Sequence, residues 1–230
     1  RRLVGGASVL ALAASLLWAG GPARGQTQIT PDTTPGRSTS TQTAALGPGP
    51  NAPTGNTTLI FGGAIIGTNL FHSFQTFNLA AGDAAQWASY FPNGSGYNGA
   101  AIGNVINRVT GGTASSIDGY LGTGAFGGDA FPNANFYFIN PAGIVFGAGA
   151  GINIPNSVHF ATASMLLFSN GGTYLATTPE GSTFSSASPL AFGFFGNQQD
   201  LLVTGATAGF VAADSRPMLV GQDVLVANSS

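Results

Sequence analysis

Apolar residues along this chain come in short runs of strand length, separated by glycine, proline and asparagine. Residues 135–163 show the pattern most clearly: apolar runs occupy 136–139 and 144–146, and residues 152–154 alternate between apolar and polar. Aromatic and β-branched residues favour strands, and the Asn-Pro-Ala-Gly sequence at 140–143 favours a tight turn. No helical period runs through this segment. It therefore predicts one rung of a stacked β structure, with three short strands joined by a turn and a glycine-rich corner.

The remainder of the chain repeats this arrangement after residue 58. Comparable runs lie at residues 59–61, 65–66, 69–79, 102–110, 165–168, 190–195, 201–204, 210–212, 218–220 and 224–227. Residues 84–88 are the one stretch where a helical turn is expected, and residues 91–99 are expected to form a loop. Glycines recur about every 25 residues, at Gly122, Gly147, Gly172 and Gly221. Such spacing is typical of solenoids, so an all-β solenoid is predicted.

Composition supports a turn-rich β protein and removes several classes of function. Only 6% of the 230 residues are charged, against about 25% in ordinary globular proteins. After residue 25, three arginines face eight acidic residues, a net charge of −5, and lysine is absent. No basic patch exists for nucleic acid or anionic lipid. The absence of cysteine excludes disulfides, thiolate zinc sites and cysteine catalysis.

The two ends of the chain differ from its middle. Residues 1–25 have the charged start, apolar stretch and small-residue cleavage pattern of a secretory signal peptide, which general export machinery would read. Residues 26–58 are rich in Thr, Pro, Gly and Ser, which predicts a mobile linker or an extended arm with only Ile29 and Leu46 as anchors. Residues 59–205 form the predicted β domain. Residues 206–230 are expected to begin further coils, since strand-like runs continue to the end of the sequence without a cap.

No arrangement of residues predicts catalysis, a cofactor or a metal. The letters of GxGxxG occur at residues 122–127, but Pro132 and neighbouring turn residues oppose the helix that a dinucleotide site needs. His72 and His159, the only histidines, each have apolar neighbours, which favours packing with hydrogen bonds to backbone over metal ligation. Asp83, Asp118 and Asp129 stand in Gly-Asp or Asp-Gly turn pairs, which favours a structural role. A β-helical polysaccharide-active enzyme is a remote alternative, because it would need clustered carboxylates or a basic residue on one face.

Several ordered blocks resemble the N-terminal secretion domain of the filamentous haemagglutinin family, the exported partners of two-partner secretion systems in Gram-negative bacteria. The resemblance covers about residues 28–205. Its blocks are Gln-Ile-Thr-Pro-Asp at 28–32, Gly-Gly at 62–63 with Gly-Thr-Asn-Leu-Phe-His-Ser-Phe at 67–74, Asn-Arg-Val-Thr-Gly-Gly at 107–112 with Ser-Ile-Asp-Gly at 116–119, residues 135–163, and Pro-Leu-Ala-Phe-Gly-Phe at 189–194. Ala142 replaces the second Asn of many members, and Pro155-Asn156 replaces the usual Gly-Gly. The NPNL motif of some subfamilies is not visible.

This resemblance implies a right-handed parallel β-helix with a few extra-helical β elements that cap its N-terminal end. It also implies a partner, an outer-membrane barrel transporter with periplasmic docking domains, and localisation outside the cell or on its surface. The secretion-motif turn would be Asn140, Pro141, Ala142, Gly143 and Ile144. Residues that recognise the transporter or hold coils together would be Asn69, Leu70, His72, Phe74, Arg108, Gly111, Asp118 and Gly119.

The resemblance implies that the exported protein is a large surface adhesin and that this domain is not an enzyme. A secreted haemolysin or contact-dependent toxin on the same export route is the alternative. Contact with host or neighbouring cells would then belong to regions downstream of Ser230.

Overall fold

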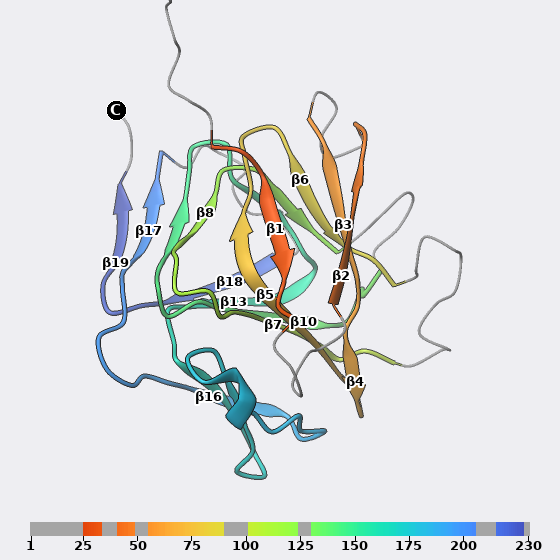
Figure 1. The fold of residues 1–230 in the computed structure, drawn as a ribbon, viewed down its shortest axis with the longest axis vertical. Helices are drawn as coiled ribbons and strands as arrows, with labels where there is room; N and C mark the ends of the chain where they lie inside the picture. The colour runs from red at the N-terminus through yellow and green to blue at the C-terminus, as the bar shows by residue number, and fades with distance from the viewer. Residues whose placement is uncertain are drawn as a thin grey trace, which may run out of the picture.

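A computed structural model describes residues 25–33, 41–48, 55–89, 101–123, 130–205 and 215–227 (Figure 1). This part of the chain is all β, with nineteen strands, one short 3-10 turn and no α-helix. It has no helix long and apolar enough to cross a membrane. The predicted all-β class is confirmed. The signal peptide, the loop at 91–99, the run at 210–212 and most of the GxGxxG match lie outside the described residues.

The first sheet is built from five parallel strands that come from successive passes of the chain. They are β5 (Asn69–Asn78), β7 (Asn104–Val109), β10 (Asn135–Ile139), β13 (Asn156–Ala161) and β18 (Ser215–Val220). The strand registers place identical residues side by side: Asn69 lies beside Asn104, which lies beside Asn135. Parallel pairing between strands so far apart in sequence requires a long connection after each strand, and the other two sheets supply it.

Two further sheets receive the chain between visits to the first. The second contains β8 (Ser115–Ile117), β11 (Ile144–Phe146), β17 (Leu201–Thr204) and β19 (Val224–Ala227), all parallel. The third contains β3 (Thr57–Gly62), β6 (Ala84–Trp87), β9 (Tyr120–Gly122) and β12 (Gly151–Asn153), also parallel. Each of the two complete passes that begin at β7 and β10 therefore runs from the first sheet to the second and then to the third.

Three antiparallel strands make the sheets mixed at their N-terminal side. β1 (Gln28–Pro31) and β4 (Ala64–Ile66) pair with β5, and β2 (Thr41–Leu46) pairs with β3. The mobile-linker interpretation is therefore wrong for residues 28–31 and 41–46. Composition misled because polar residues, namely Asp32 and Thr41, anchor these strands through buried hydrogen bonds.

The main apolar core lies between the three sheets. Strand alternation directs every second residue of the first sheet inward, including Leu70, Val105, Phe136 and Phe138, and Phe160 packs with them. Trp87 from the third sheet meets the ring of Phe136 edge to face, with centroids 4.7 Å apart. Such aromatic pairs stabilise by about 1 kcal/mol beyond their burial.

Residues 84–88 do not form the expected helical turn. They contain strand β6, which pairs with β3 on one side and β9 on the other. Ala84, Ala85 and Trp87 are fully buried there. Tertiary packing overrides the helix propensity of alanine, because a small side chain fits between adjacent strands of a stack.

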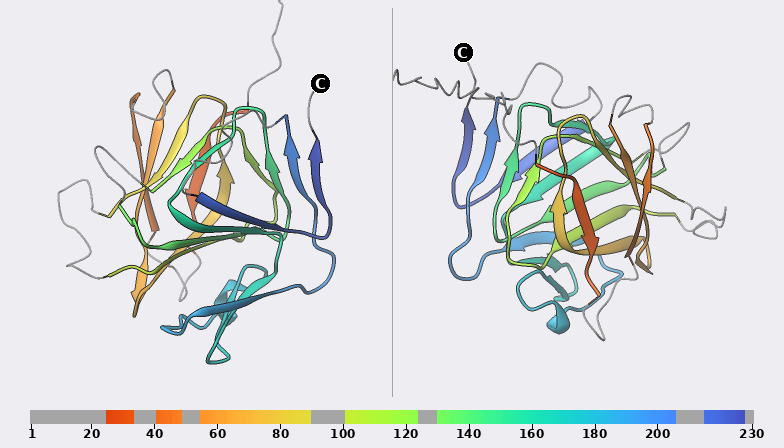
Figure 2. Two further views of the ribbon diagram at one scale, coloured as in Figure 1. Left: turned by 180° about the vertical axis from the view of Figure 1, so that it is seen from behind. Right: turned by 45° about the horizontal axis from the view of Figure 1, so that its top comes forward.

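An outer layer, residues 165–193, covers the outer face of the first sheet. It consists of β14 (Met165–Phe168), β15 (Thr173–Leu175), the 3-10 turn Pro179–Gly181 and β16 (Pro189–Gly193), with antiparallel pairing throughout. Figures 1 and 2 show it as a separate teal-to-blue unit against the strands of the first sheet. A second apolar cluster lies between them. The outer face of the first sheet is therefore apolar and is covered by the chain itself.

Candidate functional site

Asparagines form a hydrogen-bonded ladder along one edge of the first sheet. Asn135 Nδ2 donates to Asn104 Oδ1 at 3.1 Å, and Asn104 Nδ2 donates to Asn69 Oδ1 at 2.8 Å. Asn69 Nδ2 completes the series by donating to the carbonyl oxygens of Ser185 and Ala187 in the outer layer, both at 2.8 Å. Asn69 thus links adjacent strands and also binds the outer layer.

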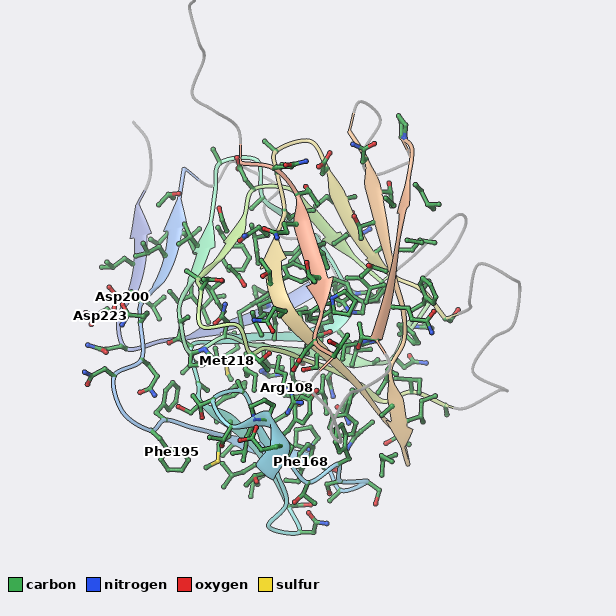
Figure 3. All side chains as sticks on the ribbon, viewed as in Figure 1. Arg108, Phe168, Phe195, Asp200, Met218 and Asp223 are labelled. Atoms are coloured by element: carbon green, nitrogen blue, oxygen red, sulfur yellow. The ribbon has the colours of Figure 1, made fainter. Side chains whose placement is uncertain are left out.

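Arg108 lies fully buried between the first sheet and the outer layer (Figure 3). Its Nε donates to Ser73 Oγ at 2.8 Å, and its Nη1 donates to the Leu175 carbonyl at 2.7 Å and to Ser182 Oγ at 2.6 Å. The guanidinium carbon sits 4.3 Å from the centre of the Tyr174 ring. This arrangement uses the planar fork of arginine, which lysine cannot reproduce.

Asp32 extends this network to the N-terminal strand. Its Oδ2 accepts hydrogen bonds from Ser73 Oγ and Thr110 Oγ1, both at 3.0 Å. Ser73 therefore connects the Asp32 carboxylate to the Arg108 guanidinium, and both charges are buried. Sequence analysis did not single out Asp32 as a site residue, although it ends the Gln-Ile-Thr-Pro-Asp block. The presence of an acidic residue within that ordered block was the available sign.

His72 is fully buried and neutral. Burial lowers its pKa from 6.5 to about 3. Its Nδ1 lies 3.1 Å from Thr41 Oγ1, whereas its Nε2 has no hydrogen-bond partner. The prediction of a packing residue fits these contacts, but the partner is a side chain rather than the expected backbone group. His159, the other histidine, stacks on Tyr137 with ring centroids 4.5 Å apart.

The turn at residues 140–143 connects β10 to β11. The Gly143 amide donates to the Asn140 carbonyl at 3.1 Å, and Gly143 has a positive φ of 114°. Asn140 Oδ1 accepts from the Ala142 amide at 3.0 Å, while Nδ2 donates to the Thr113 carbonyl and to Ser115 Oγ. Asn140 thus shapes its own turn and binds the preceding pass of the chain. Because Ala142 contributes only its backbone amide, its side chain is not needed for this hydrogen bond.

The other predicted site residues fall into the core or at corners. Leu70, Phe74 and Ile144 are buried core residues. Asp118 follows β8 and accepts a hydrogen bond from the Gly149 amide at 2.6 Å. A Cβ at Gly119 would lie 2.4 Å from the Asp83 carbonyl oxygen. Asn156 is one of the two residues that replace the usual Gly-Gly, and its φ is 72°. No other non-glycine among the described residues has a positive φ.

Gly111 is expected to resist substitution because β5 passes close to it. A Cβ there would lie 2.0 Å from the backbone oxygen of Gln75, whereas a Cβ at neighbouring Gly112 would meet nothing within 4 Å. We expect Gly111→Ala to lower the free energy of unfolding by about 2–3 kcal/mol through overpacking. Gly112→Ala should cost about 1 kcal/mol, because its φ of 72° disfavours alanine. Urea unfolding of both variants tests this; equal losses would contradict the close approach.

The described residues contain no group of three or more metal-binding side chains. The polar side chains of Asn69, Arg108 and Asn140 bind other parts of the same domain. The structure brings Asn69, His72 and Arg108 together on adjacent strands, and it places Asn140, Asp118 and Gly119 at corners. These hydrogen bonds therefore hold successive passes of the chain together.

Comparison with known protein families shows which family this chain belongs to. A search of curated proteins found no match. The family model described as the TPS secretion domain matches residues 27–227. That family is an export domain rather than a catalytic one. The chain therefore belongs to the TPS secretion domain family, as the two-partner secretion domain of a filamentous haemagglutinin-like protein that is exported across the outer membrane by its partner transporter.

Proposed function

We propose that this chain is the secretion domain of a large surface adhesin and folds as a right-handed parallel β-helix. Three observations support the β-helix: parallel registers in three sheets, a constant order of visits to them, and one core enclosed by all three. Crossovers between parallel strands are right-handed in nearly all known sheets. β1, β2 and β4 would then be the extra-helical elements that cap the N-terminal end.

In this proposal the periplasmic docking domains of the transporter recognise the chain before it folds, and the β-helix forms outside the cell. Low charge and the absence of cysteine suit passage of an extended chain through a narrow pore. A completed pass presents an open strand edge on which the next can pair. Folding outside would also oppose backward movement of the chain.

We assign the motif residues to coil stabilisation rather than to direct contact with the transporter in the folded state. The observation that carries this assignment is burial: Asn69, His72, Arg108 and Asn140 are each 0% exposed. Side chains enclosed in this way cannot be read from the surface of the folded domain. Pro141 and Ala142 are half-buried and complete the Asn140 turn.

Asn140→Ala tests this assignment. The change leaves the Thr113 carbonyl, Ser115 Oγ and the Ala142 amide without their partner. We expect a loss of about 2 kcal/mol in the free energy of unfolding, measured by urea denaturation of residues 26–230. Release into the medium, measured with the partner transporter co-expressed, should fall as well.

The control is Asn197→Ala, because Asn197 is exposed; it should leave stability and release unchanged. A second measurement is binding of the urea-unfolded chain to the immobilised periplasmic domains of the transporter. That binding should be the same for Asn140→Ala and the unmodified domain. Normal stability combined with lost binding would instead make Asn140 a direct recognition residue.

The nature of the exported protein is tested by its downstream sequence. Long adhesin repeats after Ser230 would support the adhesin, whereas a haemolysin or toxin domain there would overturn it. Neither outcome alters the export role, which depends only on the secretion domain.

A further inference from the structure

The outer layer is hydrogen-bonded to strands that lie far before it in the sequence. Asn69 donates to carbonyls 116 and 118 residues further along. The Tyr174 hydroxyl donates to the His72 carbonyl at 2.9 Å, across 102 residues. Arg108 reaches Leu175 and Ser182, across 67 and 74 residues. Asn69, His72 and Arg108 therefore have hydrogen-bond partners in residues 174–187 in addition to those on neighbouring strands.

Apolar packing shows the same dependence. The Phe71 ring lies 5.9 Å from Phe168, 5.0 Å from Tyr174 and 5.2 Å from Phe184, measured between centroids. Phe71 and Ile106 are 0% exposed, and both belong to the cluster beneath the outer layer. Without that layer, the outer face of the first sheet would present these side chains to water.

We propose that the outer layer acts as a folding clasp, so that β5 and β7 reach stable native packing only when residues 165–193 join them. The proposal rests on the export function above. It means that the first two passes cannot act as a finished template by themselves. Whichever end of the chain is delivered first, both segments must be on the same side of the membrane before the first sheet is complete.

The time between synthesis of β5 and synthesis of the outer layer can be calculated. A chain made at roughly 5–20 residues per second needs about 6–24 s to extend over the 118 residues between Asn69 and Ala187. During that interval, the N-terminal strands lack their outer partners and stay incompletely packed.

Refolding of residues 26–230 from urea, followed by pulsed hydrogen exchange, tests the clasp without any transporter. We expect the amides of β5 and β7 to become protected in the same kinetic phase as those of β14–β16. Protection of β5 and β7 ten times faster than that of the outer layer would overturn the proposal. Because no export is measured, this result is independent of the export role itself.

Two ladder variants sharpen the test. Asn69→Ala removes the two hydrogen bonds to the outer layer and the ladder bond from Asn104. The control Asn135→Ala removes only the ladder bond to Asn104. In Asn69→Ala, the rate of native-state hydrogen exchange should rise by a similar factor in β5 and in the outer layer. Asn135→Ala should leave exchange in the outer layer unchanged. Equal effects of both variants on the outer layer, or an effect of Asn69→Ala confined to β5, would contradict the clasp.

Tyr174→Phe serves if Asn69→Ala fails to fold. It deletes only the hydroxyl that binds the His72 carbonyl, and roughly 3–10-fold faster exchange is expected in β5 and the outer layer together. Faster exchange in the outer layer alone would show that the two segments open independently, which overturns the proposal.

Discussion

Replacing Arg108 with methionine is expected to lower the free energy of unfolding of this secretion domain by about 3–5 kcal/mol. Methionine fills part of the space but donates no hydrogen bond. Ser73 Oγ, Ser182 Oγ and the Leu175 carbonyl would lose their charged donor in a site closed to water. The buried Asp32 carboxylate would lose the positive charge that lies one hydroxyl away. Since domains are stable by only about 5–15 kcal/mol, this loss is a large share of the total.

Urea denaturation monitored by tryptophan fluorescence measures this loss, because Trp87 lies in the main core. Arg108→Lys is the matched variant: it keeps the charge but not the fork geometry, so an intermediate loss is expected. A Met variant as stable as the unmodified domain would show that the network adds no net stability. An Arg108→Lys variant as stable as the unmodified domain would show that only the positive charge contributes to stability.

Acidification is expected to destabilise the domain through His72. Burial holds the pKa of His72 at about 3 in the folded state, against 6.5 in the unfolded chain. Below pH 6.5 the unfolded chain binds a proton that the folded domain cannot, so stability falls as pH falls, down to about pH 3. Each pH unit in this window removes about 1.4 kcal/mol, and the full effect approaches about 5 kcal/mol. Between pH 7 and pH 4.5 the expected loss from His72 is roughly 2–3 kcal/mol.

His72→Gln isolates this contribution, because glutamine keeps a polar side chain near Thr41 and does not titrate. The variant should be less stable at pH 7 but should lose less stability than the unmodified domain between pH 7 and pH 4.5. His159→Gln is the comparison: burial also lowers the pKa of half-buried His159, so this variant should reduce the pH dependence in the same direction but by less than His72→Gln. An unchanged slope in His72→Gln would mean that His72 is not the group that titrates. Urea denaturation at four or five pH values provides the measurement.

Local sequence patterns predicted most strands in the described part of the chain. Runs such as residues 136–139 and 144–146 became β10 and β11, because aromatic and β-branched residues favour strands and the intervening proline and glycine favour a turn. The same reasoning failed at residues 84–88. Alanine has high helix propensity in isolation, and only the neighbouring strands β3 and β9 make this segment extended.

The contacts of the candidate site residues could not be predicted from the sequence. Asn69, Arg108 and Asn140 were named through resemblance, yet nothing in their local sequence indicates that Asn69 binds Ser185 or that Arg108 binds Ser182. Contacts across 74 or 116 residues depend on how the strands stack. Asp32 and Thr41 were missed for the same reason, since a polar, proline-containing segment shows no apolar pattern to mark its burial.

The sequence by itself determined the all-β class, the strand-length runs, the tight turn at residues 140–143 and the family. These depend on local conformational preference and on ordered motifs, both of which are present in the linear chain. Only the tertiary structure decided that the outer layer covers the first sheet, that Arg108 and Asp32 are buried together, and that Asn140 joins adjacent passes. Burial and long-range hydrogen bonds are properties of the packed chain, because the groups that supply them are far apart until it folds.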